Sequence, residues 1–448
     1  MDSGPVHTGS HLTWVDREGT DALEDWARSG GMALTGWRGG PPQAAQGSPA
    51  GALRGALGAL SAVGTALTGQ EPVLPGVELL GERAALQGLR RQAPWSVGGA
   101  CRSLPTRDGW LSISLPRETD RAAVPAIVGS EGSGSAWESL RRWASSCVAA
   151  EAVCRAQLLD VPAAVIPSQP GSPTDEQTEH RLGRTSTPES PYALSAGSKV
   201  GSRRQRPLVI DLTSLWAGPL CAHLLSALEA DVVKIESPQR PDGAREGTPQ
   251  FFDLLHHGHA SVALDLSDNR DVAHLRRLLA AADVVLEGSR SRGLARRGID
   301  AAALVAAGTT WTSITAYGRT GPFADRIGLG DDVAAAAGLV AQGNLVPVPC
   351  GDAIADPLTG VHAALATAAS LLSQHSHLID IAMRDIAAVT ARSEVEPHVT
   401  VWDPSTRAWW IDTPGGPFRV LEPRARAPVG NAMSLGADTG RVLQRFGA

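Results

Sequence analysis

Lysine is almost absent from this sequence of 448 residues, since only Lys199 and Lys234 occur and arginine carries the remaining positive charge. Lysine and arginine together number 40 against 46 aspartates and glutamates, which gives a net charge of -6. A nucleic-acid-binding protein needs a dominant basic face. The charge balance therefore argues against a nucleic-acid partner.

Cysteine and long apolar runs are also scarce. The five cysteines form no CxxC pair and no framework typical of secreted disulfide-bonded domains. The first residues lack the basic stretch and apolar core of a signal peptide, and no run of about 18 apolar residues predicts a membrane span. We expect a reduced, cytoplasmic protein without a membrane partner.

Composition divides the chain into five segments. Residues 1–20 form a polar tail, and residues 21–166 are mostly Ala/Leu-rich helix with a predicted strand at 108–115 and a helix at 137–159. Residues 167–206 are rich in Ser, Pro, Thr and Gly, which is typical of a linker. An α/β pattern fills residues 207–390, and a turn-rich segment occupies 391–448.

The α/β segment alternates short apolar strands with helices. Strands are predicted at 207–212, 231–236, 261–266, 283–287, 310–314 and 378–381, with helices at 220–230, 272–282 and 358–372. Strands separated by helices predict a doubly wound parallel sheet.

The first strand of this segment leads into the turn 212–219, where only Gly218 represents the glycines of a GxGxxG fingerprint. This turn disfavours NAD, although a ligand with phosphates still fits the carboxyl ends of the strands. Arginines at positions 290, 292, 296 and 297 follow the fourth strand. They fit a phosphate clamp and a solvated loop equally well.

Two motifs are candidates for a metal or for acid chemistry. The cluster at 256–259 contains three histidines without a carboxylate at ligand spacing, so we favour a polar loop and predict no metal.

Asp331 and Asp332 precede an alanine-rich helix. They are either helix N-capping residues or active-site carboxylates.

Asp356 and Pro357 precede the helix predicted at 358–372. Asp at the N-cap followed by Pro is the ordinary start of a helix. The same position favours an ionised carboxylate, which can act as a nucleophile. From the residues alone, a cap is the simpler interpretation.

An ordered series of motifs resembles the family III CoA-transferases, the CaiB/BaiF group. It runs from VIDLTSLWAGPL at 209 through DVVKIESP at 231, AADVVLEGSRSRGLARRGID at 281, ITAYGRTGPFADRIGLGDD at 314, GDAIADPLTG at 351 and LIDIAMRDIA at 378 to LGADTGRVLQRFG at 435. The resemblance covers residues 207–448. It implies a Rossmann-like CoA-binding domain at 207–390, a smaller α+β domain, and a returning segment at 391–448.

The resemblance also implies a chemistry. Asp356 occupies the position of the catalytic aspartate, which attacks an acyl-CoA thioester and passes through an anhydride and an aspartyl-CoA thioester. Coenzyme A enters as the acyl-CoA substrate, with an organic acid as acceptor. The positions that match CoA contacts are Leu215, Trp216, Ser237, Leu264, Ser267, Gly288, Ser289 and Arg296.

Residues 21–166 resemble the same family in a rearranged order. The stretch from Trp26 to Gly36 is similar to the one before the family's aspartate, but this copy has Gly47, Ser48 and Pro49 where the carboxylate belongs. It is therefore expected to be a degenerate copy that bears the small domain. Family members form interlocked dimers, so we expect either a homodimer or an intramolecular pseudo-dimer.

The resemblance favours an acyl-CoA:carboxylate CoA-transferase. One alternative is an acyl-CoA racemase or isomerase, which needs Asp331 or Asp332 as the acid–base partner of Asp356. The other alternative is a catalytically degenerate CoA-binding protein.

Overall fold

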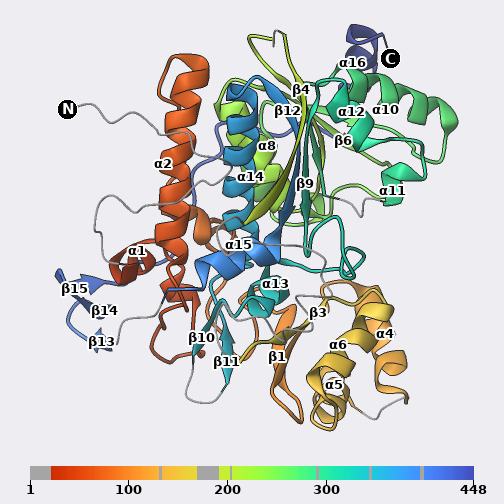
Figure 1. Cartoon of the computed structure of the whole chain (residues 1–448). Coiled ribbons are helices and arrows are strands. Elements are labelled where there is room, and N and C mark those ends of the chain that lie inside the picture. Colours follow the sequence, from red (N-terminus) through yellow and green to blue (C-terminus); the bar gives the residue numbers. More distant parts are fainter. Residues whose placement is uncertain are drawn as a thin grey trace.

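A seven-stranded sheet lies at the centre of the computed structural model, which describes residues 22–130, 134–168, 191–201, 204–288, 292–342, 346–393 and 398–447 (Figure 1). Its strand order is β4-β12-β9-β8-β5-β6-β7. The strands from β12 to β7 are mutually parallel, and β4 pairs antiparallel with β12 at one edge. Their bounds are β4 Tyr192–Lys199, β5 Leu208–Leu212, β6 Asp231–Glu236, β7 Ala260–Ala263, β8 Val284–Glu287, β9 Thr310–Thr315 and β12 His375–Ala382.

The parallel strands confirm the predicted doubly wound fold. In chain order they lie 6-5-4-1-2-3 across the sheet, which is the arrangement of two βαβαβ halves meeting at a switch point. Alternate side chains of β8 enter different cores, since Val284 and Leu286 pack with one cluster and Val285 with the other. The sheet is thus covered on both faces.

Helices cover the two faces in separate groups. The first core includes α8 (Ala217–Ala227) and α14 (Ala355–Leu372), and the second includes α10 (Asn269–Ala281) and α12 (Ala301–Ala306). One predicted boundary was wrong, because β7 ends at Ala263 rather than at residue 266. There Asp265 accepts hydrogen bonds from both the amide and the hydroxyl of Ser267, which turns the chain out of the sheet.

The N-terminal segment shares the core of the large sheet. It contains α1 (Ala22–Arg28), η1 (Met32–Leu34), α2 (Pro49–Thr68), η2 (Val77–Leu80) and α3 (Glu82–Gln87). Figure 1 shows α2 beside α14, and the two helices are in direct contact. Their common core extends from Leu23 to Val420, so segments far apart in sequence fold as one unit.

Helix α2 is long and apolar enough to span a membrane by length and composition, although no span was predicted from the sequence. Its Leu53, Leu57 and Leu60 side chains are buried in the common core. One face of α2 therefore packs against α14, while 33% of its apolar window is buried.

A small α+β unit completes the N-terminal segment. Its antiparallel sheet consists of β1 (Cys101–Pro105), β2 (Trp110–Ser114) and β3 (Ala163–Ile166), covered by α4 (Glu118–Val128), α5 (Ala136–Ala144) and α6 (Ala149–Leu158). The single helix predicted at 137–159 is therefore two helices. The hydroxyls of Ser145 and Ser146 donate to the carbonyls of Arg142 and Trp143 and help to end α5.

The C-terminal segment returns across both halves of the chain. A hairpin sheet of β13 (Thr400–Asp403), β14 (Ala408–Thr413) and β15 (Gly416–Arg419) is followed by α16 (Thr439–Arg445). The Leu421 amide donates to the Ala27 carbonyl at 2.9 Å, while the Ser261 amide of β7 donates to Asp438 at 3.0 Å. This segment therefore joins the N-terminal helices to the large sheet.

Candidate functional site

Asp356 lies in the first turn of α14, where the sequence had suggested an N-cap. The helix begins earlier than predicted, at Ala355, and its N-cap is Ile354. The Asp356 carboxylate does not cap its own helix; it accepts a hydrogen bond from the backbone amide of Ala217, the first residue of α8. The helix dipole of α8 therefore favours the ionised form of this carboxylate.

The start of α13 (Gly330–Ala336) lies directly against Asp356. A methyl group in place of the Gly330 hydrogen would overlap the Oδ2 atom of Asp356 and the Ala353 carbonyl. Next in the chain, Asp331 accepts hydrogen bonds from the Ala353 amide at 2.9 Å and from the Ser96 hydroxyl. Two helix starts thus bring Asp331 and Asp356 into one site.

Asp332 plays the capping role that the sequence had offered as one interpretation. Its Oδ1 atom accepts from the Leu329 amide at 3.1 Å and from the Ser114 hydroxyl at 2.8 Å. Its Oδ2 atom is buried and has no hydrogen-bond partner among the described residues. Of the two neighbouring aspartates, Asp331 is the one that meets the loop before Asp356.

An arginine from the N-terminal segment lies among these carboxylates. The Nε and Nη2 atoms of Arg83 form a bidentate pair with the fully buried Asp352, and the Nε bond is 2.9 Å long. The guanidinium carbon is 5.0 Å from the ring centre of Trp216, in cation–π geometry. Its charge also acts on Asp331 and Asp356, so the site is partly neutralised by a residue from α3.

Burial shifts the acidity of this cluster. It raises the pKa of Asp356 to about 7, where the Arg83 charge lowers that pKa and the charges of Asp331 and Asp352 raise it. Burial raises the pKa of Asp331 to about 6, helped by Asp352 and opposed by Arg83. The pKa of Asp332 rises to about 7 for the same reason. Carboxyls that titrate near neutrality suit both nucleophilic and acid–base roles.

The N-terminal segment contributes Arg83, Ser96 and Ser114 to this site, and sequence reasoning identified none of them. The one available signal was the charged pair Glu82–Arg83 in an otherwise apolar helix. The N-terminal segment therefore completes the site around Asp356 of the second segment.

A buried lysine network fixes the turn between β5 and α8. The Nζ atom of Lys234 lies 2.9 Å from Oδ2 of Asp242 and donates to the Thr213 carbonyl at 3.0 Å. Asp242 in turn accepts from the Leu215 amide at 2.9 Å, and Leu215 has a φ of 71°. The network holds a backbone that non-glycine residues rarely adopt, and this turn positions the Ala217 amide at Asp356.

The structure brings most of the predicted CoA contacts to one edge. Leu215 and Trp216 follow β5, Ser237 follows β6, Leu264 and Ser267 follow β7, and Gly288 follows β8. Because these strands are parallel, all their carboxyl ends lie at the same edge. Arg296 lies beyond β8 and is exposed, whereas Ser289 lies outside the described residues.

The side chains at these positions differ in their freedom to meet a ligand. The Ser237 hydroxyl donates to Gln239 at 2.7 Å and the Ser267 hydroxyl to Asp265 at 2.6 Å. Leu264 and Trp216 are buried, while Leu215 is 46% exposed and Gly288 is exposed. Leu215, Ser267, Gly288 and Arg296 are therefore the described positions that are exposed to solvent.

The arginines after β8 do not act as one group. Arg297 donates to the Leu266 and Gly293 carbonyls at 3.1 and 2.8 Å, so it supports the fold. Arg290 and the side chain of Arg292 lie outside the described residues.

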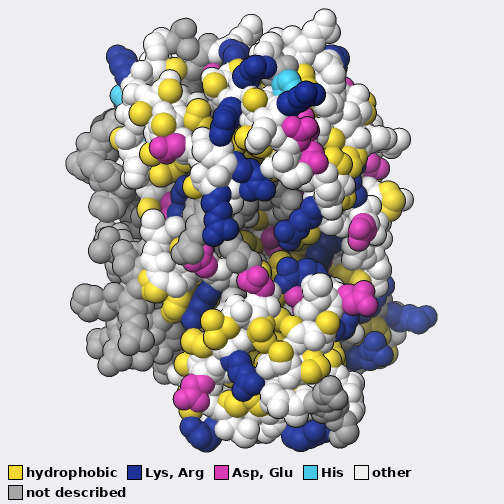
Figure 2. Space-filling model, turned by 90° about the vertical axis from the view of Figure 1, so that its right-hand side faces the viewer, with side chains coloured by type: hydrophobic (Ala, Val, Ile, Leu, Met, Phe, Trp, Pro, Cys, Tyr) yellow, Lys and Arg dark blue, Asp and Glu magenta, His cyan; other side chains and the backbone are white. Residues whose placement is uncertain are grey.

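Figure 2 shows basic side chains gathered around a hollow between the body of the large sheet and the small α+β unit below it.

The histidines at 256–259 are not the polar loop that we predicted. His256 ends α9 (Pro249–His256) and, like His259, is buried, with 3.4 Å between their Nδ1 atoms. Burial lowers the pKa of His259 to about 3 and also lowers that of His256. Within the described ranges, no group of three or more candidate metal ligands occurs.

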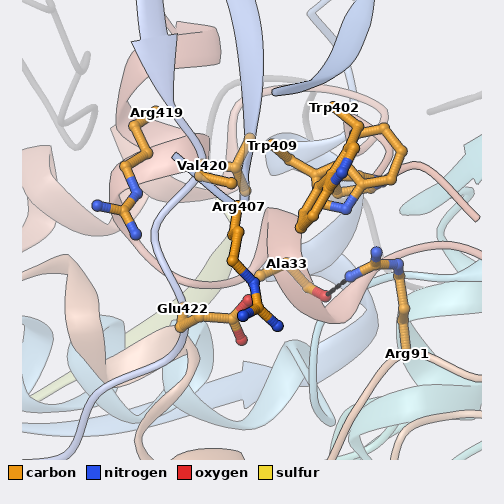
Figure 3. Close-up of a pocket in the computed structure, with 10 residues that line it drawn as sticks. Ala33, Arg91, Trp402, Arg407, Trp409, Arg419, Val420 and Glu422 are labelled. Atoms are coloured by element: carbon orange, nitrogen blue, oxygen red, sulfur yellow. Dashed lines mark hydrogen bonds between the residues drawn. The ribbon is translucent and has the colours of Figure 1, made fainter. Parts of the chain in front are cut away.

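A second hollow lies away from Asp356, between η1 and the hairpin sheet (Figure 3). This pocket of about 160 Å³ is lined by Trp402 and Trp409 together with Arg91, Arg407 and Arg419. Arg91 already donates to the carbonyls of Ala33 and Gly40. None of the lining residues belongs to the carboxylate cluster.

Comparison with known proteins finds similarity to CoA-transferases. The sequence model described as CoA-transferase family III matches residues 207–400. Succinate–glutarate CoA-transferase of Agrobacterium fabrum is 30% identical over 208 residues, which are 42% of this chain and 52% of that protein. Formyl-CoA:oxalate CoA-transferase of Afipia carboxidovorans is 28% identical over 259 residues, covering 53% of this chain and 58% of that one.

Among solved structures, a CAIB/BAIF family protein from Brucella suis has a TM-score of 0.42 and 25% sequence identity, over 48% of this chain and 66% of that one. The chain spans about half the length of the curated relatives it matches, 52% and 58% in the two cases above.

Proposed function

We propose that the protein transfers CoA from an acyl-CoA thioester to an organic acid, because residues 207–400 match the sequence model described as CoA-transferase family III. The observation that carries this proposal is the position of Asp356. Asp356 is half-buried, and its carboxylate accepts a hydrogen bond from the Ala217 backbone amide at the start of α8 and lies against Gly330, which has no side chain. A nucleophile needs such access combined with a fixed orientation.

The proposed reaction proceeds through covalent exchange on Asp356. The carboxylate attacks the thioester carbonyl, the C–S bond breaks, and an acyl–aspartyl anhydride and CoA thiolate result. The thiolate then attacks the aspartyl carbonyl and releases the donor acid. The acceptor carboxylate reverses these two steps, forming a new anhydride and then a new thioester, so that Asp356 is regenerated without net proton transfer.

The surroundings of Asp356 fit these steps. The Ala217 amide orients the carboxylate and can stabilise negative charge that develops on its oxygen. Gly330 can lie against Oδ2 only because it has no side chain, since a Cβ atom there would overlap both Oδ2 and the Ala353 carbonyl. The turn held by Lys234 and Asp242 keeps that amide in place.

We propose that the acyl-CoA substrate lies along the carboxyl edge of the parallel strands. Leu215, Gly288 and Arg296 border this edge and are open to solvent, and Arg240 after β6 is also exposed. The two arginines suit the phosphates of CoA. The hydroxyls of Ser237 and Ser267 are already engaged by Gln239 and Asp265 at this solvent-exposed edge, so these serines help to shape it.

We further propose that one chain contains a complete site as an intramolecular pseudo-dimer. This proposal is supported by the contribution of Arg83, Ser96 and Ser114 from the N-terminal segment to the carboxylates of the second segment. Sedimentation of the full chain tests it: an active monomer is expected, whereas activity restricted to a dimer would overturn the self-contained arrangement.

The second candidate is an acyl-CoA racemase or isomerase. It is favoured by one observation, namely that Asp331 and Asp356 both have a pKa near neutrality and lie at adjoining helix starts. Such a pair could remove and return an α-proton. Uptake of solvent deuterium at the α-carbon without exchange of CoA would select this reaction.

The transferase proposal is tested by CoA exchange between acyl-CoA donors and a panel of organic acids. The donors are acetyl-CoA and succinyl-CoA, and the acids are acetate, oxalate, succinate and glutarate. We expect new thioesters with the wild-type chain and none with Asp356→Ala. Tight CoA binding without exchange for any pair would indicate a catalytically degenerate protein.

A further inference from the structure

Arg83 is paired with Asp352, and its charge acts on both Asp331 and Asp356. Its guanidinium has three nitrogens, of which Nε and Nη2 are engaged by Asp352. Among the described residues, Nη1 makes no hydrogen bond, and the side chain remains 26% exposed. Nη1 carries two N–H donors, so a planar cation with a fixed orientation has capacity for one more carboxylate.

Charge gives a reason for such a contact. Asp331, Asp352 and Asp356 lie together at the site, and their ionised forms repel an incoming carboxylate in a poorly solvated environment. Arg83 is the cation that acts on both Asp331 and Asp356. Among the described residues, Arg83 therefore supplies a compensating charge for an anionic acceptor at this site.

The guanidinium of Arg83 is held in a fixed orientation. Asp352 holds one edge of the guanidinium through two bonds, and the Trp216 ring lies 5.0 Å below the guanidinium carbon. A fixed arginine loses little conformational entropy when it binds a second carboxylate. If Arg83 holds the acceptor acid beside the aspartyl carbonyl, the attack becomes an oriented reaction within one complex.

We propose that Arg83 of the N-terminal segment binds the carboxylate of the acceptor acid through Nη1 and positions it for attack at Asp356. The inference rests on the proposed transferase function, which it deepens by assigning the acceptor subsite. It also gives the degenerate N-terminal segment a direct part in the reaction, namely the choice of acceptor.

The test separates the two halves of the reaction. Arg83→Gln should still form the aspartyl-CoA adduct from succinyl-CoA alone, as followed by intact-protein mass spectrometry. It is expected to raise KM for glutarate by about 100-fold, through the loss of charge-assisted hydrogen bonds from Nη1. Arg83→Lys, which keeps the charge without the planar fork, should recover part of this loss.

Two further variants keep the result interpretable if the unpaired Asp352 disturbs folding. Arg83→Gln combined with Asp352→Asn replaces the ion pair with an amide pair and should show the same rise in KM for glutarate. The matched control is Glu82→Gln combined with Arg426→Gln, which removes the neighbouring buried ion pair and should leave that KM unchanged.

The outcomes distinguish this inference from the proposed function. If the wild-type chain forms no adduct with any acyl-CoA, the transferase function fails. If adducts form and Arg83→Gln leaves KM for every acceptor acid within about twofold, the assignment of Arg83 is wrong while the function stands. Loss of adduct formation in folded Arg83→Gln would likewise contradict it, because Arg83 would then act on the donor half-reaction.

Discussion

Gly330 lies so close to Asp356 that a single added methyl group would overlap the carboxylate oxygen Oδ2. The same methyl group would meet the Ala353 carbonyl, which belongs to the backbone and cannot turn aside. The two residues start different helices, α13 and α14. The carboxylate of Asp356 can therefore keep its position only while residue 330 has no side chain.

The first prediction follows from this contact. Gly330→Ala should lower kcat for CoA exchange at least tenfold, because the carboxylate must leave its position, and should lower the free energy of unfolding by about 1–3 kcal/mol. Steady-state kinetics and urea unfolding measure the two effects. Gly58→Ala in α2 is the matched control, since its added methyl group meets nothing within 4 Å. Equal kinetics for both variants would contradict the proposed geometry.

The second prediction concerns the junction between the N-terminal and C-terminal segments. Arg426 pairs with the fully buried Glu82 through Nε at 2.7 Å and Nη2 at 2.9 Å. Glu82→Ala leaves this arginine without its partner and should cost about 3–5 kcal/mol of unfolding free energy. The measurement is urea unfolding at neutral pH.

The exposed pair Arg90–Glu422 provides a comparison for that variant. It joins the same two segments at 3.7 Å, with side chains that are 70% and 68% exposed. Glu422→Ala should therefore cost less than about 1 kcal/mol. If Glu82→Ala and Glu422→Ala lower the free energy of unfolding by similar amounts, the buried pair does not stabilise the junction between the two segments.

The third prediction is a fall in stability with rising pH. Asp331, Asp332 and Asp356 have pKa values of about 6, 7 and 7 in the folded protein, above that of an aspartate in an unfolded chain, which is about 3.9. The folded state therefore binds more protons between about pH 4 and 7. The free energy of unfolding should decrease across this window and become level above it.

Asp356→Asn removes one of the three titrations and should flatten that decrease. At pH 8 the variant is expected to be more stable than the wild type by on the order of 1 kcal/mol. Thermal unfolding between pH 5 and 8 measures the slope. Asp403→Asn is the control: hydroxyl and amide donors lower the pKa of Asp403 to about 2, so its removal leaves this slope unchanged. A stability that rises with pH would contradict the raised pKa values.

The sequence was sufficient for the elements whose local pattern is strong. The apolar run at 231–236 forms β6 with the predicted bounds, because a buried parallel strand needs little beyond apolar residues between turns. Helix limits were less accurate. The predicted helix at 137–159 is broken after Ala144 by serines that bond to the preceding turn, a local competition that periodicity does not show.

The candidate site was only partly accessible to sequence reasoning. Asp356 was identified from its place in an ordered series of motifs, whereas its local sequence suggested a cap. Arg83 was missed because its partner Asp352 lies 269 residues away in the chain, and no periodicity encodes such a contact. The buried His256 and His259 were misread as a polar loop for the same reason, since tertiary packing covers them.

The central claim is that Asp356 forms the covalent intermediate. The most direct measurement is peptide mapping by mass spectrometry after mixing the wild-type chain with succinyl-CoA and quenching within one turnover. The proposal predicts a hydroxylamine-sensitive adduct on the peptide that contains Asp356, and no adduct with Asp356→Asn. An adduct on another carboxylate, or CoA exchange that persists in Asp356→Asn, would contradict the account.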